Sequence, residues 1–242
     1  MTVVTGLGAF LIKNALTSQD VLVQLRSANV IVPPRGIGRK RQHPEISTIC
    51  HLMATLATSE QLAYPISVTH RDRPDFLLQI ADSKVGVEVT EAITEQFANY
   101  SAHAARECLG ALVEPTHFRW GAPAPTRLQM DALFHQTELS SDGWAGNSAE
   151  KEWALAIQHF VDQKLEKLAH PDFERFGQNW LAIYDNLPLP HFDLEKAVSF
   201  LAPLIANRWT DTVSFDSIFV ACGTTVVRLT ARGANYLPDR HA

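Results

Sequence analysis

Two acidic residues stand in places where a carboxylate is unfavourable unless it has a partner or binds a cation. Glu88 lies within Gly-Val-Glu-Val-Thr, a valine-rich segment typical of a buried strand, and Asp75 follows Pro74 at the start of another apolar segment. Burying an ionised carboxylate without a partner costs a large amount of free energy. Two carboxylates brought together make an oxygen site of the kind that Mg²⁺ prefers. A metal ion there can activate water and neutralise charge on a phosphodiester.

A third acid, Glu45, stands near the start of a predicted helix. Pro44 suits the first helical position, where its missing N–H costs nothing, and the helix is expected to end near residues 57–59. Apolar residues then recur at helical spacing: Ile46, Ile49, Leu52, Met53 and Leu56. Because Glu45 is in phase with several of them, we expect its side chain to face the core.

A β-hairpin is predicted to position Asp75 and Glu88. Residues 75–80 and 85–90 have strand character, and residues 81–84 form a plausible turn between them. Antiparallel pairing then places both acids near the same end of the hairpin. Alternation along the second strand puts Glu88 on the face opposite its valine neighbours.

The rest of the chain alternates predicted helices and strands, which indicates an α/β sandwich with a central mixed β-sheet. The first 30 residues are expected to contain a helix and a short strand. The later elements are a helix over 94–112, a helix from Asn147 to about Ala169 that starts with a capping box of Asn147 and Glu150, a strand over 179–186, a helix capped by Asp193 and interrupted or kinked at Pro203, and two strands within 217–230.

We expect one domain over residues 1–242. Its parts are an N-terminal extension with a basic loop (1–43), a helix with the hairpin (44–93), an irregular insertion (113–147), and a crossover helix with the remaining strands (148–242).

The segment Arg73-Pro74-Asp75, followed after twelve residues by Glu88-Val89-Thr90, resembles the PD-(D/E)xK nuclease superfamily. The resemblance covers residues 44–91 and extends loosely over 147–169 and 180–185. It implies a restriction-endonuclease-like α/β/α sandwich and a magnesium-dependent nuclease, in which Mn²⁺ can substitute for Mg²⁺. It also implies that the metal is held by Asp75, Glu88 and the backbone carbonyl of Val89, with Glu45 adding a ligand or orienting a water.

The chain departs from the superfamily motif at Thr90, where a lysine is expected. That lysine would help to stabilise charge at the reacting phosphate. Lys164 lies within the apolar face of the helix predicted over 147–169, and a lysine there needs an acidic partner. We therefore expect Lys164 to replace the motif lysine, with Lys167 at the edge of the same face and Lys84 a weaker candidate in the turn. The apolar face consists of Trp153, Ile157, Phe160, Val161 and Leu168.

The chain carries a formal net charge of −5, so binding a polyanion requires a local basic patch. Residues 33–43 form a predicted loop with four cations and no acid: Arg35, Arg39, Lys40 and Arg41. We expect these side chains to contact a nucleic-acid backbone, with DNA favoured over RNA. Cutting both strands of a duplex would favour a homodimer.

Other classes of site are disfavoured. Cys50, Cys108 and Cys222 are too dispersed for a disulfide framework or a zinc site, which fits a reducing, cytoplasmic location. No apolar run is long enough to span a membrane. No Walker A, GxGxxG or GxSxG motif occurs.

Two alternatives to a nuclease remain open. Thr90 is compatible with a catalytically inactive nuclease-fold protein that binds nucleic acid or a protein partner. The three acids are also compatible with an enzyme of another class that uses carboxylates for general acid–base catalysis.

Overall fold

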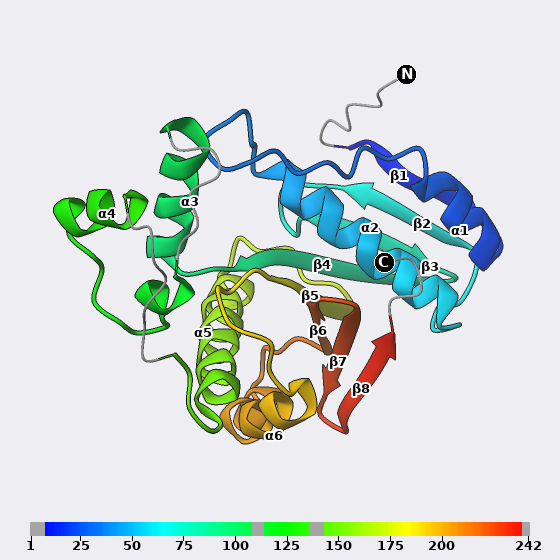
Figure 1. Ribbon diagram of the computed structural model, residues 1–242. Coiled ribbons are helices and arrows are strands. Elements are labelled where there is room, and N and C mark those ends of the chain that lie inside the picture. The colour runs from blue at the N-terminus through cyan, green and yellow to red at the C-terminus, as the bar shows by residue number, and fades with distance from the viewer. Residues whose placement is uncertain (1–7, 108–113, 136–142, 239–242) are drawn as a thin grey trace.

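The computed structural model describes residues 8–107, 114–135 and 143–238, and one eight-stranded sheet runs through them (Figure 1). The strands are β1 (Phe10–Ala15), β2 (Ile66–His70), β3 (Phe76–Ile80), β4 (Ser83–Ala92), β5 (Gln178–Asp185), β6 (Ser217–Cys222), β7 (Thr225–Thr230) and β8 (Gly233–Pro238). The helices are α1 (Ser18–Leu25), α2 (Gln42–Thr58), α3 (Glu95–Glu107), α4 (Arg127–Phe134), α5 (Ser148–Ala169) and α6 (Leu194–Ile205), with 3₁₀ turns η1 (Pro115–Phe118) and η2 (Ala206–Trp209).

The strands lie in the sheet in the order in which they occur in the sequence. Strands β1 to β4 pair antiparallel, β4 to β6 pair parallel, and β6 to β8 pair antiparallel. Parallel neighbours need crossover connections, and these contain α3, α4 and α5 before β5 and α6 before β6. The predicted α/β architecture with a mixed central sheet is therefore confirmed.

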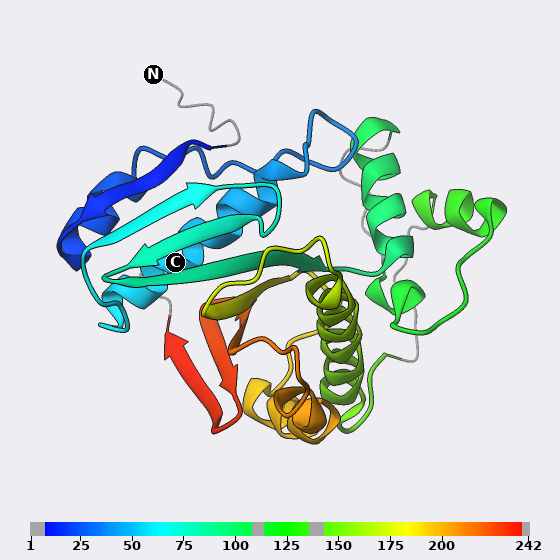
Figure 2. The ribbon, with the colours of Figure 1, turned by 180° about the vertical axis from the view of Figure 1, so that it is seen from behind.

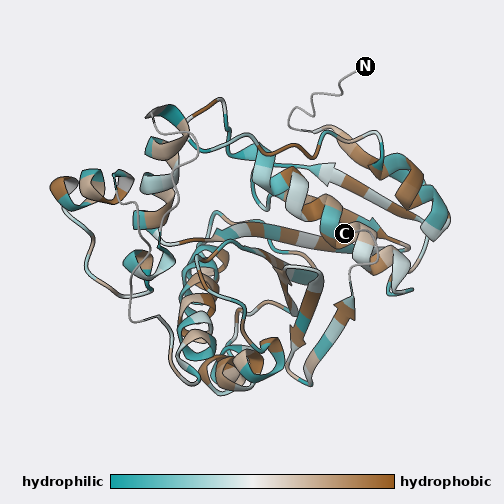
Figure 3. Ribbon diagram, in the orientation of Figure 1, coloured by the Kyte–Doolittle hydropathy of each residue, from teal (hydrophilic) through white to brown (hydrophobic). Residues whose placement is uncertain are grey.

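Helices cover both faces of the sheet. Residues of α1 and α2 pack on one face against alternate residues of β4, including Val87 and Val89. Residues of α5 and α6 pack on the other face against β5, β6 and Ala92. Figure 2 shows the two helical layers from behind, and Figure 3 shows apolar residues along the central strands and interleaved with polar residues on the helices. Residues two apart on a strand point to the same face of the sheet, so Glu88 and Thr90 lie on the same face as Ala92, which is the face that α5 covers.

Several local predictions at helix ends were wrong. Helix α2 begins at Gln42, so Pro44 occupies its third position. The Asn147 side chain makes no cap hydrogen bond; Glu150 instead lies buried and accepts from the backbone N–H of Asp193 at 3.4 Å. The predicted capping box is therefore absent. The Asp193 cap is present, and α6 continues through Pro203 without interruption.

The segment expected to be irregular contains two short helical elements, η1 and α4, the latter with a capping box at Thr126. Tyr100, Phe118 and Leu133 form a small apolar cluster that ties these elements to α3. The last five residues of the helix predicted over 94–112 lie outside the described residues, as does Cys108. Strands β2 and β8 were not predicted.

None of the helices in the described ranges is long and apolar enough to cross a lipid bilayer.

Candidate functional site

Glu88 is buried in the middle of β4, with 1% of its side chain exposed. Its Oε1 atom accepts a hydrogen bond from Lys164 Nζ at 2.8 Å and a second from Lys167 Nζ. The spacing of three residues on α5 places both ammonium groups on one helical face. The other carboxylate oxygen, Oε2, is buried and has no hydrogen-bond partner among the residues that the structure describes. Lys164 therefore lies next to Glu88 as predicted, and Lys167 joins it.

Asp75 directly precedes β3, and pairing of Phe76 with Val87 places it beside Glu88, as the predicted hairpin required. Its Oδ2 atom accepts from the backbone N–H of Val89 at 2.8 Å, and its Oδ1 atom accepts from Arg41 Nη2 at 2.9 Å. Burial, followed by repulsion from the nearby carboxylates of Glu88 and Glu45, raises the pKa of Asp75 to about 6.

Glu45 lies in the first turn of α2 and is buried, as its helical phase predicted. Its Oε1 atom accepts from Arg41 Nε at 2.6 Å, and His70 Nε2 lies 3.6 Å from its Oε2 atom. Burial acts to raise the pKa of Glu45, but His70 and Arg41 outweigh it, so the pKa lies below its ordinary value. Arg41 thus bridges Glu45 and Asp75.

The three acids do not form one three-carboxylate metal site. Within residues 8–107, 114–135 and 143–238, no three His, Cys, Asp or Glu side chains are grouped so that they could hold a metal ion. Glu45 is instead paired with Arg41, which also contacts Asp75, whereas Glu88 is paired with Lys164 and Lys167. The prediction that Glu45 is a metal ligand beside Asp75 and Glu88 is therefore not supported by its placement.

The donor set that remains still suits a hard divalent ion. Mg²⁺ is commonly held by one or two carboxylates, with waters or substrate oxygens completing the shell. Glu88 offers a buried oxygen that lacks a partner, and Asp75 carries a charge that burial disfavours. These two carboxylates and the carbonyl of Val89 are the groups that would hold the ion.

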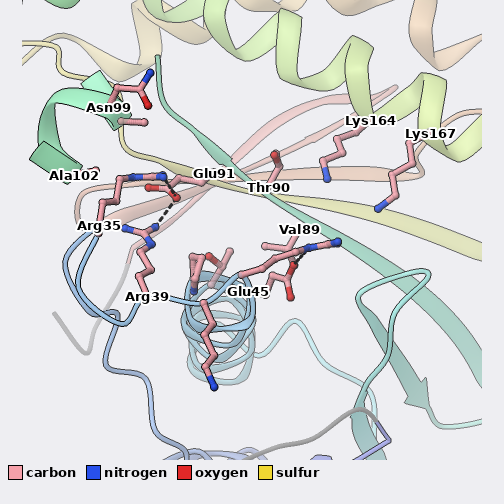
Figure 4. Close-up of a pocket in the computed structure, with 16 residues that line it drawn as sticks. Arg35, Arg39, Glu45, Val89, Thr90, Glu91, Asn99, Ala102, Lys164 and Lys167 are labelled. Carbon is pink, nitrogen blue, oxygen red and sulfur yellow. Dashed lines mark hydrogen bonds and ion pairs between the residues drawn. The ribbon is translucent and has the colours of Figure 1, made fainter. Parts of the chain in front are cut away.

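A pocket of about 590 Å³ opens beside this group, between the loop preceding α2, the end of β4, α3 and α5 (Figure 4). Its lining contains Val89 and Thr90, and Asp75 and Glu88 are not among the described residues that line it. Six cations and two acids line it: Arg35, Arg39, Lys40, Arg41, Lys164 and Lys167, with Glu45 and Glu91. A cleft with this excess of positive charge attracts anions.

The basic loop is held by Glu91, on the face of β4 opposite Glu88. The Nη2 atoms of Arg35 and Arg39 both lie 2.5 Å from Glu91 Oε2 (Figure 4). The Asn186 Nδ2 atom lies 2.6 Å from Glu91 Oε1. We call Arg35, Arg39 and Glu91 the loop clamp. Four side chains of this loop were predicted to contact phosphate. Arg41 is paired with Asp75, as Arg35 and Arg39 are with Glu91. Lys40 is exposed and has no carboxylate contact within the described structure.

Sequence reasoning identified Asp75, Glu88 and Lys164 but missed the loop clamp and the bridging role of Arg41. The four-residue spacing of Arg41 and Glu45 on one helix was an available signal. The contacts of Arg35 and Arg39 with Glu91 span more than 50 positions and left no local pattern.

Buried carboxylates with paired cations beside a positively charged pocket can bind a metal ion, a phosphate group or both. Comparison with models of protein families, with curated proteins and with solved structures finds no match to this chain.

Proposed function

We propose that the protein is a magnesium-dependent nuclease that hydrolyses phosphodiester bonds, with DNA favoured over RNA as substrate. The observation that carries the proposal is the surrounding of Glu88: one oxygen accepts from Lys164 and Lys167, the other has no hydrogen-bond partner within the described part of the chain, and Asp75 lies alongside. This combines a site for a cation with two ammonium groups that can contact a phosphate.

Each residue has a defined role in the proposal. Asp75, Glu88 and the carbonyl of Val89 hold the metal, which supplies an activated water and neutralises charge on the phosphodiester. Lys164 and Lys167 stabilise the charge that develops on the phosphate oxygens, as the lysine absent at Thr90 would. Glu45 positions Arg41 beside Asp75.

The arrangement of elements also supports the proposal. A helix carrying Glu45, a hairpin carrying Asp75 and Glu88, a crossover helix and a parallel strand follow one another along the chain. This order agrees with the restriction-endonuclease-like fold that the sequence resemblance implies. The excess of cations in the pocket suits a polyanionic substrate despite the net charge of −5.

One observation favours the alternative, a catalytically inactive nuclease-fold protein that binds nucleic acid or a protein partner. The acids already have cationic partners, with Lys164 and Lys167 at Glu88 and Arg41 at Asp75. Such pairs can neutralise buried carboxylates without a metal ion.

Cleavage assays with plasmid DNA and oligonucleotides, in Mg²⁺, Mn²⁺ or EDTA, test the proposal. We expect metal-dependent cleavage that Glu88→Gln abolishes and that a Lys164→Ala/Lys167→Ala double variant lowers by about 10²–10³-fold. The matched controls are Glu195→Gln on α6 and Lys151→Ala on α5, both at exposed positions, which should cleave like the wild type. Circular dichroism checks that each variant is folded.

Titration calorimetry separates the two candidates. A folded protein that gives no binding heat with millimolar Mg²⁺ or Mn²⁺ and cleaves nothing supports the inactive binding protein. Cleavage that survives Glu88→Gln would remove the proposed site.

A further inference from the structure

A second pocket, of about 430 Å³, lies between α5 and the start of α3. Side chains that suit a planar, hydrogen-bonding ligand line it: Thr94, Glu95, Gln96, Trp120, His159 and Gln163. Its volume falls within the range of small-ligand sites, about 300–1,000 Å³. We call it the aromatic pocket.

Trp120 is fixed in the wall of the aromatic pocket. Its ring centroid lies 5.0 Å from that of His159 and 5.6 Å from that of Phe160 on α5. Its backbone N–H donates to Glu152 Oε1 at 2.6 Å, and Glu152 also accepts from Arg119 Nε at 3.2 Å. The glutamate is mostly buried, so the ring is held in place before any ligand arrives.

The aromatic pocket is connected to the candidate active site by shared residues. Gln163 also lines a third pocket of about 520 Å³, to which Arg41 and Lys167 contribute. Arg41 and Lys167 in turn line the pocket beside Glu88. On α5, His159, Gln163 and Lys167 follow one another at intervals of four residues, which spans about 12 Å along the helix axis. The three pockets thus form one track along α5.

Charge differs between the two ends of this track. No lysine or arginine is among the described residues that line the aromatic pocket, and Glu95 is. A phosphate is therefore disfavoured there, whereas a neutral ring with amine and carbonyl groups finds an aromatic surface, two amides and a carboxylate acceptor. The cations are gathered at the other end, at Lys164 and Lys167.

We propose that the aromatic pocket binds one unpaired nucleobase of a single-stranded nucleic acid whose phosphates lie over Lys164 and Lys167. This inference rests on the proposed nucleic-acid substrate. Bases in a duplex are stacked and paired, so a side pocket can take only an unpaired or extruded base. Stacking on an aromatic side chain tolerates any base sequence.

Fluorescence anisotropy with a labelled single-stranded oligonucleotide and the matching duplex, in EDTA, tests the inference without cleavage. We expect Trp120→Ala to weaken single-strand binding about 5- to 100-fold and to leave duplex binding unchanged. Trp120→Phe, which keeps a ring, should retain most of the affinity. Phe10→Ala is the control, because this exposed aromatic residue lies on β1 and lines none of the three pockets.

A thermal melt shows whether Trp120→Ala is folded, and His159→Ala provides a second variant, expected to weaken single-strand binding as well. Wild-type affinity for the single strand in both variants would overturn the inference, as would a wild type that binds only duplex. A wild type that binds no oligonucleotide would overturn both this inference and the proposed function. If Trp120→Ala weakens single-strand binding but no metal supports cleavage, the base pocket stands and the nuclease proposal fails.

Discussion

Asp75 carries a charge that its surroundings disfavour, although two donors contact it. The hydrogen bond from Val89 and the nearby Lys164 lower its pKa, but burial and the two neighbouring carboxylates dominate. An acid whose pKa is higher in the folded than in the unfolded state binds its proton more tightly when folded. The contribution of Asp75 to the free energy of unfolding therefore falls as pH rises from the ordinary pKa of 3.8 to about 6, and this contribution is constant above that range.

Asp75→Asn should consequently stabilise the metal-free protein at pH 8 by about 1–2 kcal/mol, because the amide keeps the Val89 contact without the charge. The gain should become small near pH 3.5, where the aspartate is protonated in the folded state and mostly protonated in the unfolded state. Urea unfolding in EDTA at the two pH values measures this. The control is Asp72→Asn, whose side chain is 71% exposed. A loss of stability at pH 8 would contradict the prediction.

For Glu91 in the loop clamp we expect the opposite effect: removing the negative charge should destabilise the protein. Glu91 is 11% exposed and receives both Arg35 and Arg39. Glu91→Gln leaves two partly buried guanidinium groups with a neutral partner, and we expect it to lower the free energy of unfolding by about 2–3 kcal/mol.

The matched control for Glu91→Gln is Glu174→Gln. Glu174 pairs with Arg71 but is 52% exposed, so its loss should cost less than about 0.5 kcal/mol. Equal effects of the two substitutions in urea unfolding would show that the clamp contributes no more than an ordinary surface pair.

At the scale of elements, the loop before α2 docks on α3 through a close backbone approach. Gly36 has φ +81°, and a Cβ there would lie 2.8 Å from the carbonyl oxygen of Ala102. Gly38 has a similar φ of +71° with open space around it. Comparing substitutions at these two glycines therefore separates the effect of backbone strain from the effect of steric contact.

Gly36→Ala should therefore destabilise the protein more than Gly38→Ala. Both substitutions place an alanine in the left-handed region, at about 1–2 kcal/mol, and Gly36→Ala must also push the loop away from α3. Thermal unfolding of the two variants measures the difference. A Gly38→Ala variant as unstable as Gly36→Ala would mean that strain alone accounts for the effect.

The sequence was most informative where contacts are local. The hairpin, its alternation and the helical phase of Glu45 follow from periods of two and 3.6 residues. Lys164 was identifiable because a lysine in an apolar stripe requires a partner. The loop clamp and the Glu150 contact were not predictable, since each joins segments more than 40 positions apart. Strand β2 was missed although its five residues alternate between buried and partly exposed positions, a period-two pattern that could have identified it.

At the scale of the whole molecule, the charge distribution is uneven. The chain has a net charge of −5, yet six cations face one pocket. The proposed nucleic-acid binding depends on these local cations and should weaken steeply with salt.

Lys40 provides a test of that uneven distribution. Lys40→Ala should reduce the slope of log affinity against log salt by about 0.7–0.9, because one phosphate contact is lost. Lys13→Ala removes an equal charge from exposed β1, outside the pocket, and should leave the slope unchanged. Anisotropy titrations between 50 and 200 mM salt measure both, at concentrations where such dependence is large. Identical slopes for both variants would place binding elsewhere.

Strand β4 pairs with β3 through a tight turn and with β5 across a crossover of more than 80 residues. Glu88 meets its lysines only when α5 has packed on the sheet, 76 and 79 positions later. Until α5 packs, Glu88 on the β3–β4 hairpin therefore carries a negative charge without its lysine partners, on a surface that is buried in the folded protein. Closing such a long loop is slow, so we expect competence for ligand binding to return after most of the secondary structure when the unfolded chain is allowed to refold.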